Sequence, residues 1–142
     1  MATFPRVTPH EADALMRDAG YIYLDVRSEQ EFEAGHPAEA YNVPFMHMGA
    51  GGMVANANFE AVVAATFERT AKIVVGCKAG GRSRRAVEAL IGAGFVSIVD
   101  QCAGFDGVRD AFGAVTEPGW SRLGLATELG QPSGRSYDAL KR

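Results

Sequence analysis

Short apolar runs alternate with stretches of helical periodicity along most of this chain. The clearest run is Lys72-Ile73-Val74-Val75-Gly76-Cys77, whose continuous hydrophobic character is typical of a strand buried on both faces. Weaker strand patterns occupy residues 21–26, 40–43 and 95–99, with helical patterns between them. Consecutive parallel strands need crossover connections of this kind, which are usually helices. The alternation therefore predicts an α/β fold, with a mainly parallel central sheet of about five strands and helices on both faces.

Two capping boxes mark where helices should begin. Thr8 with Glu11, and Ser28 with Glu31, carry the hydroxyl and carboxylate spacing that satisfies the first free N–H groups of a helix. Residues 46–58 contain three glycines and predict a long loop. Further helices are expected over residues 59–69, 84–93 and 106–112, and periodicity fades from Gly113 onward.

The chain has 142 residues, of which 47% are hydrophobic and 22% are charged, and this composition is typical of one globular domain. We expect a single domain over residues 1–130. Residues 131–142 form a polar C-terminal tail that is expected to fray or to contact a partner.

Charge and cysteine content exclude several classes of protein. A formal net charge of -3 leaves no basic surplus for a phosphate backbone, so we expect no nucleic-acid partner. No apolar run approaches the roughly 20 residues that span a bilayer, and the first residues lack the pattern of a signal peptide. Two cysteines are too few for a disulfide framework. We therefore expect a cytoplasmic protein with no membrane partner.

The segment Cys77-Lys78-Ala79-Gly80-Gly81-Arg82-Ser83 lies between the buried strand and a predicted helix. Ligands of open α/β sheets bind beyond the carboxyl ends of the strands, which is where this segment falls. A glycine pair lets several backbone N–H groups converge, and a helix N-terminus beside them makes an anion site. Positive charge surrounds the segment, supplied by Lys78, Arg82, Arg84 and Arg85.

Cys77 stands at the mouth of this predicted anion site. Helix N-termini and neighbouring cations favour the thiolate form of a cysteine, which is a nucleophile. A cysteine at a strand end is also often a small buried hydrophobe, and a glycine pair is often plain turn chemistry. The combination of nucleophile, glycine pair, arginine and helix start in one loop favours a catalytic site.

Other motifs flank the loop, and their order along the chain is informative. Together with the loop at Cys77, they resemble the signatures of single-domain rhodaneses, the thiosulfate sulfurtransferase-like family, over roughly residues 5–112. The flanking motifs are Asp25-Val26-Arg27, Glu31-Phe32, Gly35-His36, Asn42-Val43-Pro44, Ala93-Gly94-Phe95 and Ala103-Gly104-Phe105.

This resemblance implies a function and a set of roles. Cys77 takes the place of the persulfide-forming cysteine, and a sulfane sulfur passes from a small anionic donor such as thiosulfate to cyanide, a thiol or a protein acceptor. Asp25 and Arg27 act as supports of the site, and neither a cofactor nor a metal is implied. Lys78 and Arg82 would steer the donor, or Arg82 would instead pin the loop to a carboxylate. The predicted loop residues are Lys78, Ala79, Gly80, Gly81, Arg82 and Ser83.

Two other functions stay open. Phosphatases and arsenate reductases of the same fold use a Cys-to-Arg loop that is longer by one residue, whereas Cys77 to Arg82 spans six residues here. The family resemblance indicates that this shorter loop suits a sulfane sulfur. A non-enzymatic rhodanese-like binding module is the second alternative, although the nucleophile is present.

The chain departs from the family pattern at several positions. Pro37 replaces the usual isoleucine after the Gly-His pair, Ala103 replaces the first glycine of a pair, and Val108 replaces a tryptophan. Trp120 could compensate for the packing that is lost. Cys102 has two interpretations, an inert buried thiol or a partner that resolves a Cys77 persulfide.

Overall fold

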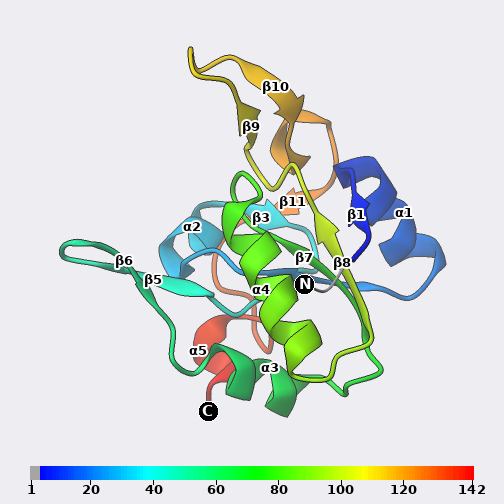
Figure 1. Cartoon of the computed structure of the whole chain (residues 1–142), viewed down its shortest axis with the longest axis vertical. Helices are drawn as coiled ribbons and strands as arrows, with labels where there is room; N and C mark the ends of the chain where they lie inside the picture. The colour runs from blue at the N-terminus through cyan, green and yellow to red at the C-terminus, as the bar shows by residue number, and fades with distance from the viewer. Residues whose placement is uncertain (1–3) are drawn as a thin grey trace.

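The computed structural model describes residues 4–142 and has a five-stranded parallel sheet at its centre (Figure 1). The strands run in the order β1 (Arg6–Val7), β8 (Ser97–Gln101), β7 (Lys72–Gly76), β2 (Ile22–Asp25) and β4 (Tyr41–Asn42). Helices cover both faces, so the predicted α/β fold is confirmed. The buried run that the sequence singles out is the central strand, β7.

The helices are α1 (Pro9–Asp18), α2 (Glu29–Ala34), α3 (Phe59–Thr66), α4 (Gly81–Gly92) and α5 (Tyr137–Leu140). Both predicted capping boxes form, because the Thr8 and Ser28 hydroxyls each accept from the backbone N–H of the glutamate three residues later. The helix predicted from residue 84 begins three residues earlier, at Gly81, which places its first turn inside the glycine-rich segment.

Side chains on the two faces of the sheet belong to two core layers. Ile73 and Val75 face α3, α4 and α5, whereas Val74 and Tyr23 face α1, α2 and the short 3-10 helix η1 (Trp120–Arg122). Because side chains alternate along a strand, Cys77 continues the first layer and points toward α4.

Two segments form hairpins that the sequence patterns did not predict. Residues 46–58, expected as a loop, contain β5 (Met46–Gly49) paired with β6 (Gly52–Ala55). The helix expected over residues 106–112 is wrong, since β9 (Gly107–Arg109) pairs there with β10 (Val115–Pro118). The Asp110 carboxylate accepts from the N–H groups of Phe112 and Ala114, which bends the chain into a turn instead of a helix.

The C-terminal segment packs against the domain. Strand β11 (Thr127–Glu128) pairs antiparallel with β3 (His36–Pro37), and Tyr137 of α5 is buried in the first core layer. The expectation that residues 131–142 fray is therefore wrong, because the apolar ring of Tyr137 anchors them; the domain boundary at residue 130 stays a prediction. None of the helices within residues 4–142 is long and apolar enough to cross a bilayer.

Candidate active site

Cys77 lies immediately after β7, and its loop leads straight into α4. The sulfur accepts a hydrogen bond from the backbone N–H of Gly80 at 3.1 Å, and the residue is only 2% exposed. The Ser83 hydroxyl closes the same turn by donating to the Gly80 carbonyl at 3.2 Å. No side chain of the described residues caps α4, so the backbone N–H groups of its first turn stay available to an anion at the loop.

Gly80 has a backbone conformation that requires glycine. Its φ of 99° is left-handed, and a Cβ there would lie 2.5 Å from the carbonyl oxygen of Cys102. The Cys102 backbone therefore supports the loop from behind. This close packing fixes the N–H that points at the Cys77 sulfur.

A second segment, residues 102–107, holds the carbonyl side of the loop. The Phe105 N–H donates to the Cys77 carbonyl at 2.7 Å, and the N–H groups of Asp106 and Gly107 donate to the Lys78 carbonyl at 3.0 and 3.3 Å. These bonds turn both carbonyls toward the second segment. They leave the interior of the loop to N–H groups, as an anion site needs.

Arg82 is held by a carboxylate across the site. Its guanidinium donates to both oxygens of Glu31, at 2.6 and 3.0 Å. Burial disfavours the charge on Glu31, but hydrogen bonds and attraction from Arg82 outweigh it and lower the pKa of Glu31 to about 2. The hydrogen bonds to Glu31 likewise raise the pKa of Arg82 above its usual range. Of the two predicted roles for Arg82, pinning the loop is the one that this contact supports.

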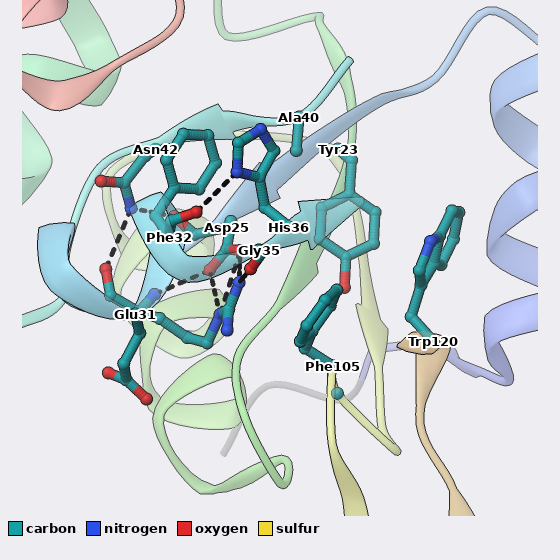
Figure 2. Close-up of polar contacts among 12 residues, drawn as sticks. Tyr23, Asp25, Glu31, Phe32, Gly35, His36, Ala40, Asn42, Phe105 and Trp120 are labelled. Carbon is teal, nitrogen blue, oxygen red and sulfur yellow. Dashed lines mark hydrogen bonds and ion pairs between the residues drawn. The ribbon is translucent and has the colours of Figure 1, made fainter. Parts of the chain in front are cut away.

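Asp25 and Arg27 form a buried pair beside the loop. The Arg27 guanidinium donates to the Asp25 carboxylate at 2.7 Å and to the Gly35 carbonyl at 2.6 Å, and it lies 4.4 Å from the centre of the Phe105 ring. Burial disfavours the charge of Arg27, yet Asp25 overcomes it and raises the pKa of Arg27. The Asn42 amide donates to the carbonyls of both residues (Figure 2).

The remaining cations have different surroundings. Lys78 is exposed at the rim of a pocket of about 290 Å³ and forms no ion pair with any side chain of residues 4–142. Arg84 is also exposed, whereas Arg85 turns to the hairpin, with its guanidinium 3.4 Å from the Met46 sulfur. Other residues that line the pocket are Arg27, Glu31, Ala34, Gly35, Phe105, Asp106 and Ser121.

Comparison with known proteins agrees with this geometry. The family model described as Rhodanese-like domain matches residues 8–111. The chain belongs to this family. It is 39% identical over 110 residues to thiosulfate sulfurtransferase 16, chloroplastic, from Arabidopsis thaliana, covering 78% of this chain and 82% of that protein.

Two further proteins are similar to this chain. Rhodanese-like domain-containing protein 15, chloroplastic, from Arabidopsis thaliana is 40% identical over 101 residues, covering 71% of this chain and 56% of that protein. The crystal structure of Rv0390 from M. tuberculosis superposes with a TM-score of 0.75 at 28% identity, covering 91% of this chain and all of that one. The rhodanese-like architecture expected from the motifs is thus confirmed.

The second cysteine of this rhodanese-like domain faces another direction. The Cys102 thiol lies 3.4 Å from the Val7 carbonyl and lines a cavity of about 310 Å³ beside Thr8, Pro9 and His10. Burial raises the pKa of the Cys102 thiol, with Arg6 acting against that shift. Both cysteines are free. These contacts support the interpretation of Cys102 as an inert thiol.

His36 is buried and serves the packing of the domain. Its ring stacks on Phe32 with centroids 3.6 Å apart, Nδ1 lies 2.6 Å from the Phe32 carbonyl, and Nε2 lies 3.0 Å from the Glu128 carboxylate. Within residues 4–142 no three His, Cys, Asp or Glu side chains are grouped so that they could hold a metal ion.

The sequence patterns do not predict that Glu31 and Phe105 belong to the site. The sequence predicts only that Glu31 closes a capping box and forms part of a motif. In the structure Glu31 caps α2 and also holds Arg82. Its carboxylate can do both because one oxygen is shared between Ser28 and Arg82. No spacing rule links residues so far apart, although Glu31 and Phe105 each stood in a motif of the family.

Proposed function

We propose that this rhodanese-like domain is a sulfurtransferase that moves a sulfane sulfur through a persulfide on Cys77. The observation that carries the proposal is the Gly80 N–H directed at the Cys77 sulfur, 3.1 Å away, at the N-terminus of α4. A negative charge on this sulfur is stabilised by the N–H group and by the helix dipole. The relative named thiosulfate sulfurtransferase 16 supports the same chemistry.

The reaction is a double displacement. The Cys77 thiolate attacks the outer sulfur of thiosulfate, a new S–S bond forms, and the bond to the departing sulfite breaks with its electron pair. Cyanide or a thiolate then attacks the terminal sulfur of the persulfide and takes it, which returns Cys77 as a thiolate. The two steps need no external oxidant or reductant.

The other residues of the site shape the loop and attract the donor. Lys78 supplies an exposed cation at the rim of the pocket, which draws a dianionic donor toward Cys77. Arg82 is engaged with Glu31 and fixes the first turn of α4. Asp25 and Arg27 hold the strand end next to the loop.

Mass spectrometry of the intact protein after incubation with thiosulfate tests the proposal. We expect one added sulfur on Cys77, and cyanide should remove it with formation of thiocyanate. The Cys77→Ser variant should show neither, whereas Cys102→Ser, the matched control, should show both. Unchanged sulfur transfer by Cys77→Ser would contradict the mechanism.

One observation favours a non-catalytic binding module instead, namely the 2% exposure of Cys77. A sulfur that donors never reach would stay unmodified at any thiosulfate concentration. The same mass measurement separates the two functions, since the module predicts no mass change on Cys77.

The phosphatase and arsenate reductase alternative has less support. An arginine that binds a tetrahedral oxyanion must be free to face the loop, whereas both Glu31 oxygens occupy Arg82. An assay with an aryl phosphate tests this alternative. The cytoplasmic location and the absence of nucleic-acid and membrane partners stay predictions.

A further inference from the structure

Gln101, at the end of β8, is fully buried and uses every hydrogen-bonding position of its amide. Its Oε1 accepts from the N–H groups of Ala103 and Gly104, both at 2.9 Å. Its Nε2 donates to the Gly104 carbonyl at 2.8 Å and to the Tyr23 hydroxyl at 3.2 Å. The Gln101 side chain thus binds both N–H groups and a carbonyl group of the turn at residues 102–104, and so fixes the turn.

This turn lies directly against the backbone of the Cys77 loop. Gly104 has a left-handed φ of 69°, and a Cβ there would lie 2.6 Å from the Cys77 carbonyl oxygen and 2.5 Å from that of Lys78. The next residue, Phe105, donates its N–H to the Cys77 carbonyl at 2.7 Å. The position of Gly104 therefore limits where the Cys77–Lys78 peptide can lie.

The fourth hydrogen bond of Gln101 goes to Tyr23 of β2, the strand that pairs with β7. The Tyr23 hydroxyl packs on Gly76, where any Cβ would collide with it. The Tyr23 ring is itself held by an edge contact with Trp120, with ring centroids 5.4 Å apart (Figure 2). Gln101 therefore connects Gly104 on one side of the loop with the phenol that packs on Gly76, the residue before Cys77.

We propose that Gln101 is a positioning residue for the Cys77 loop: by fixing the 102–104 turn, it orients the Cys77–Lys78 peptide and keeps the Gly80 N–H directed at the sulfur. Loss of the amide would remove the hydrogen bonds from the backbone N–H groups of Ala103 and Gly104. The hydrogen bond from the Phe105 N–H to the Cys77 carbonyl would then weaken. The sulfur would then lose part of the stabilisation that favours its thiolate. The consequence for sulfur transfer rests on the proposed function, but the consequence for the thiol does not.

The test compares how fast iodoacetamide alkylates Cys77 across a range of pH, in a Cys102→Ser background that leaves one thiol. Gln101→Met keeps the length and removes the amide. We expect the pH of half-maximal alkylation to rise by about one unit, so that the rate at lower pH falls about tenfold. Tyr23→Phe removes only the hydroxyl partner, and we expect a shift in the same direction with a rate about threefold lower.

Asn56 provides a matched control for the loss of a buried amide. It donates to the Pro44 carbonyl at 2.8 Å and to the Tyr137 hydroxyl at 3.2 Å, and it accepts from the Asn58 N–H at 3.0 Å, at the base of the β5–β6 hairpin. Asn56→Leu should lower the melting temperature and leave the alkylation profile unchanged.

An unchanged profile in both Gln101→Met and Tyr23→Phe, with only a lower melting temperature, would show that Gln101 is merely structural and would overturn the proposal. If Gln101→Met does not fold, Tyr23→Phe decides by the same criterion. A shifted profile in a protein whose parent forms no thiocyanate would uphold the positioning role and reject the proposed function, so the two failures are distinguishable.

Discussion

The Arg82 guanidinium and the Glu31 carboxylate meet in a two-pronged contact, at 2.6 and 3.0 Å, that joins the first turn of α4 to the first turn of α2. Such paired geometry fixes the direction of an arginine as well as its charge. Because Arg82 is the arginine at the end of the Cys77 loop, Glu31 fixes the position of the end of the loop through its contact with Arg82.

Replacing Glu31 with glutamine should therefore weaken the domain. A glutamine side chain at this position could still cap α2, but it would leave the Arg82 charge without its carboxylate. We expect Glu31→Gln to lower the free energy of unfolding by about 1–3 kcal/mol, measured by urea denaturation, and to reduce kcat/KM for sulfur transfer. Asp13→Asn is the control, because Asp13 pairs with Arg17 on the exposed face of α1. An equal loss of unfolding free energy in Asp13→Asn would show that the ion pair of Glu31 with Arg82 matters no more than an exposed one.

The same contact predicts how stability depends on pH. Since the pKa of Glu31 is lowered from 4.5 to about 2, the folded state favours the ionised form. This contribution is fully present above the ordinary pKa and is lost as the pH falls from about 4.5 toward 2. Urea denaturation of the parent and Glu31→Gln at several pH values should show a difference that narrows through this range. A difference that stays constant down to about pH 3 would argue against the ion pair as its cause.

Local patterns predicted the parts of the fold that local chemistry determines. Thr8 and Ser28 begin helices because their capping boxes need only the next few residues, and the run ending at Cys77 is apolar enough to identify a buried strand. The β9–β10 hairpin was missed because Asp110 bends the chain through its own side chain, against a weak helical pattern. Periodicity gives no sign that Tyr137 belongs to the core.

The site shows the same division. Cys77, the glycine pair and the helix start could be recognised because they are contiguous in the sequence. The contacts of Arg82 with Glu31 and of Gln101 with Tyr23 join residues 51 and 78 positions apart, and only the folded sheet brings them together. The motifs therefore predicted which residues occupy the loop, but not which residues hold it.

Gly104 should tolerate no side chain. Its left-handed φ would strain the backbone of any other residue. A Cβ at this position would also collide with the carbonyl oxygens of Cys77 and Lys78, which lie 2.5–2.6 Å away. We expect Gly104→Ala to cost about 2–4 kcal/mol and to slow alkylation of Cys77. Gly94→Ala is the matched control, since its φ of 100° is also left-handed but its nearest neighbour is the flexible Arg69 side chain at 3.7 Å. Gly94→Ala should lower the free energy of unfolding by only about 1–2 kcal/mol. Similar losses in the two variants would mean that the backbone around Gly104 moves and relieves the collision with the Cys77 and Lys78 carbonyls.

Cys102 should be dispensable for sulfur transfer. Its thiol faces the Val7 carbonyl and a separate cavity, so it does not share the pocket beside Lys78. We expect Cys102→Ser to keep at least half of the parent activity, and mild oxidation of the parent should give no disulfide within the chain. Non-reducing peptide mapping checks the second point. A trapped Cys77–Cys102 disulfide would assign Cys102 a resolving role.

Lys78 should act on the capture of the donor and not on the chemical step. Its ammonium is exposed beside the pocket with no carboxylate partner among residues 4–142, so it attracts a dianion without holding the loop. We expect Lys78→Gln to raise KM for thiosulfate about three- to tenfold and to leave kcat within about twofold. Lys72→Gln is the control, because Lys72 lies at the opposite end of β7, where it donates to the Ala19 carbonyl.

Ionic strength gives an independent check on this role of Lys78. Salt screens exposed charges over roughly 10 Å at 0.1 M, so KM of the parent should rise with added salt. KM of Lys78→Gln should rise much less, because the charge that salt screens is already absent. Parallel salt dependence of KM in the two proteins would show that salt does not act through the Lys78 charge. A fall in kcat alone would place Lys78 among the groups that hold the loop.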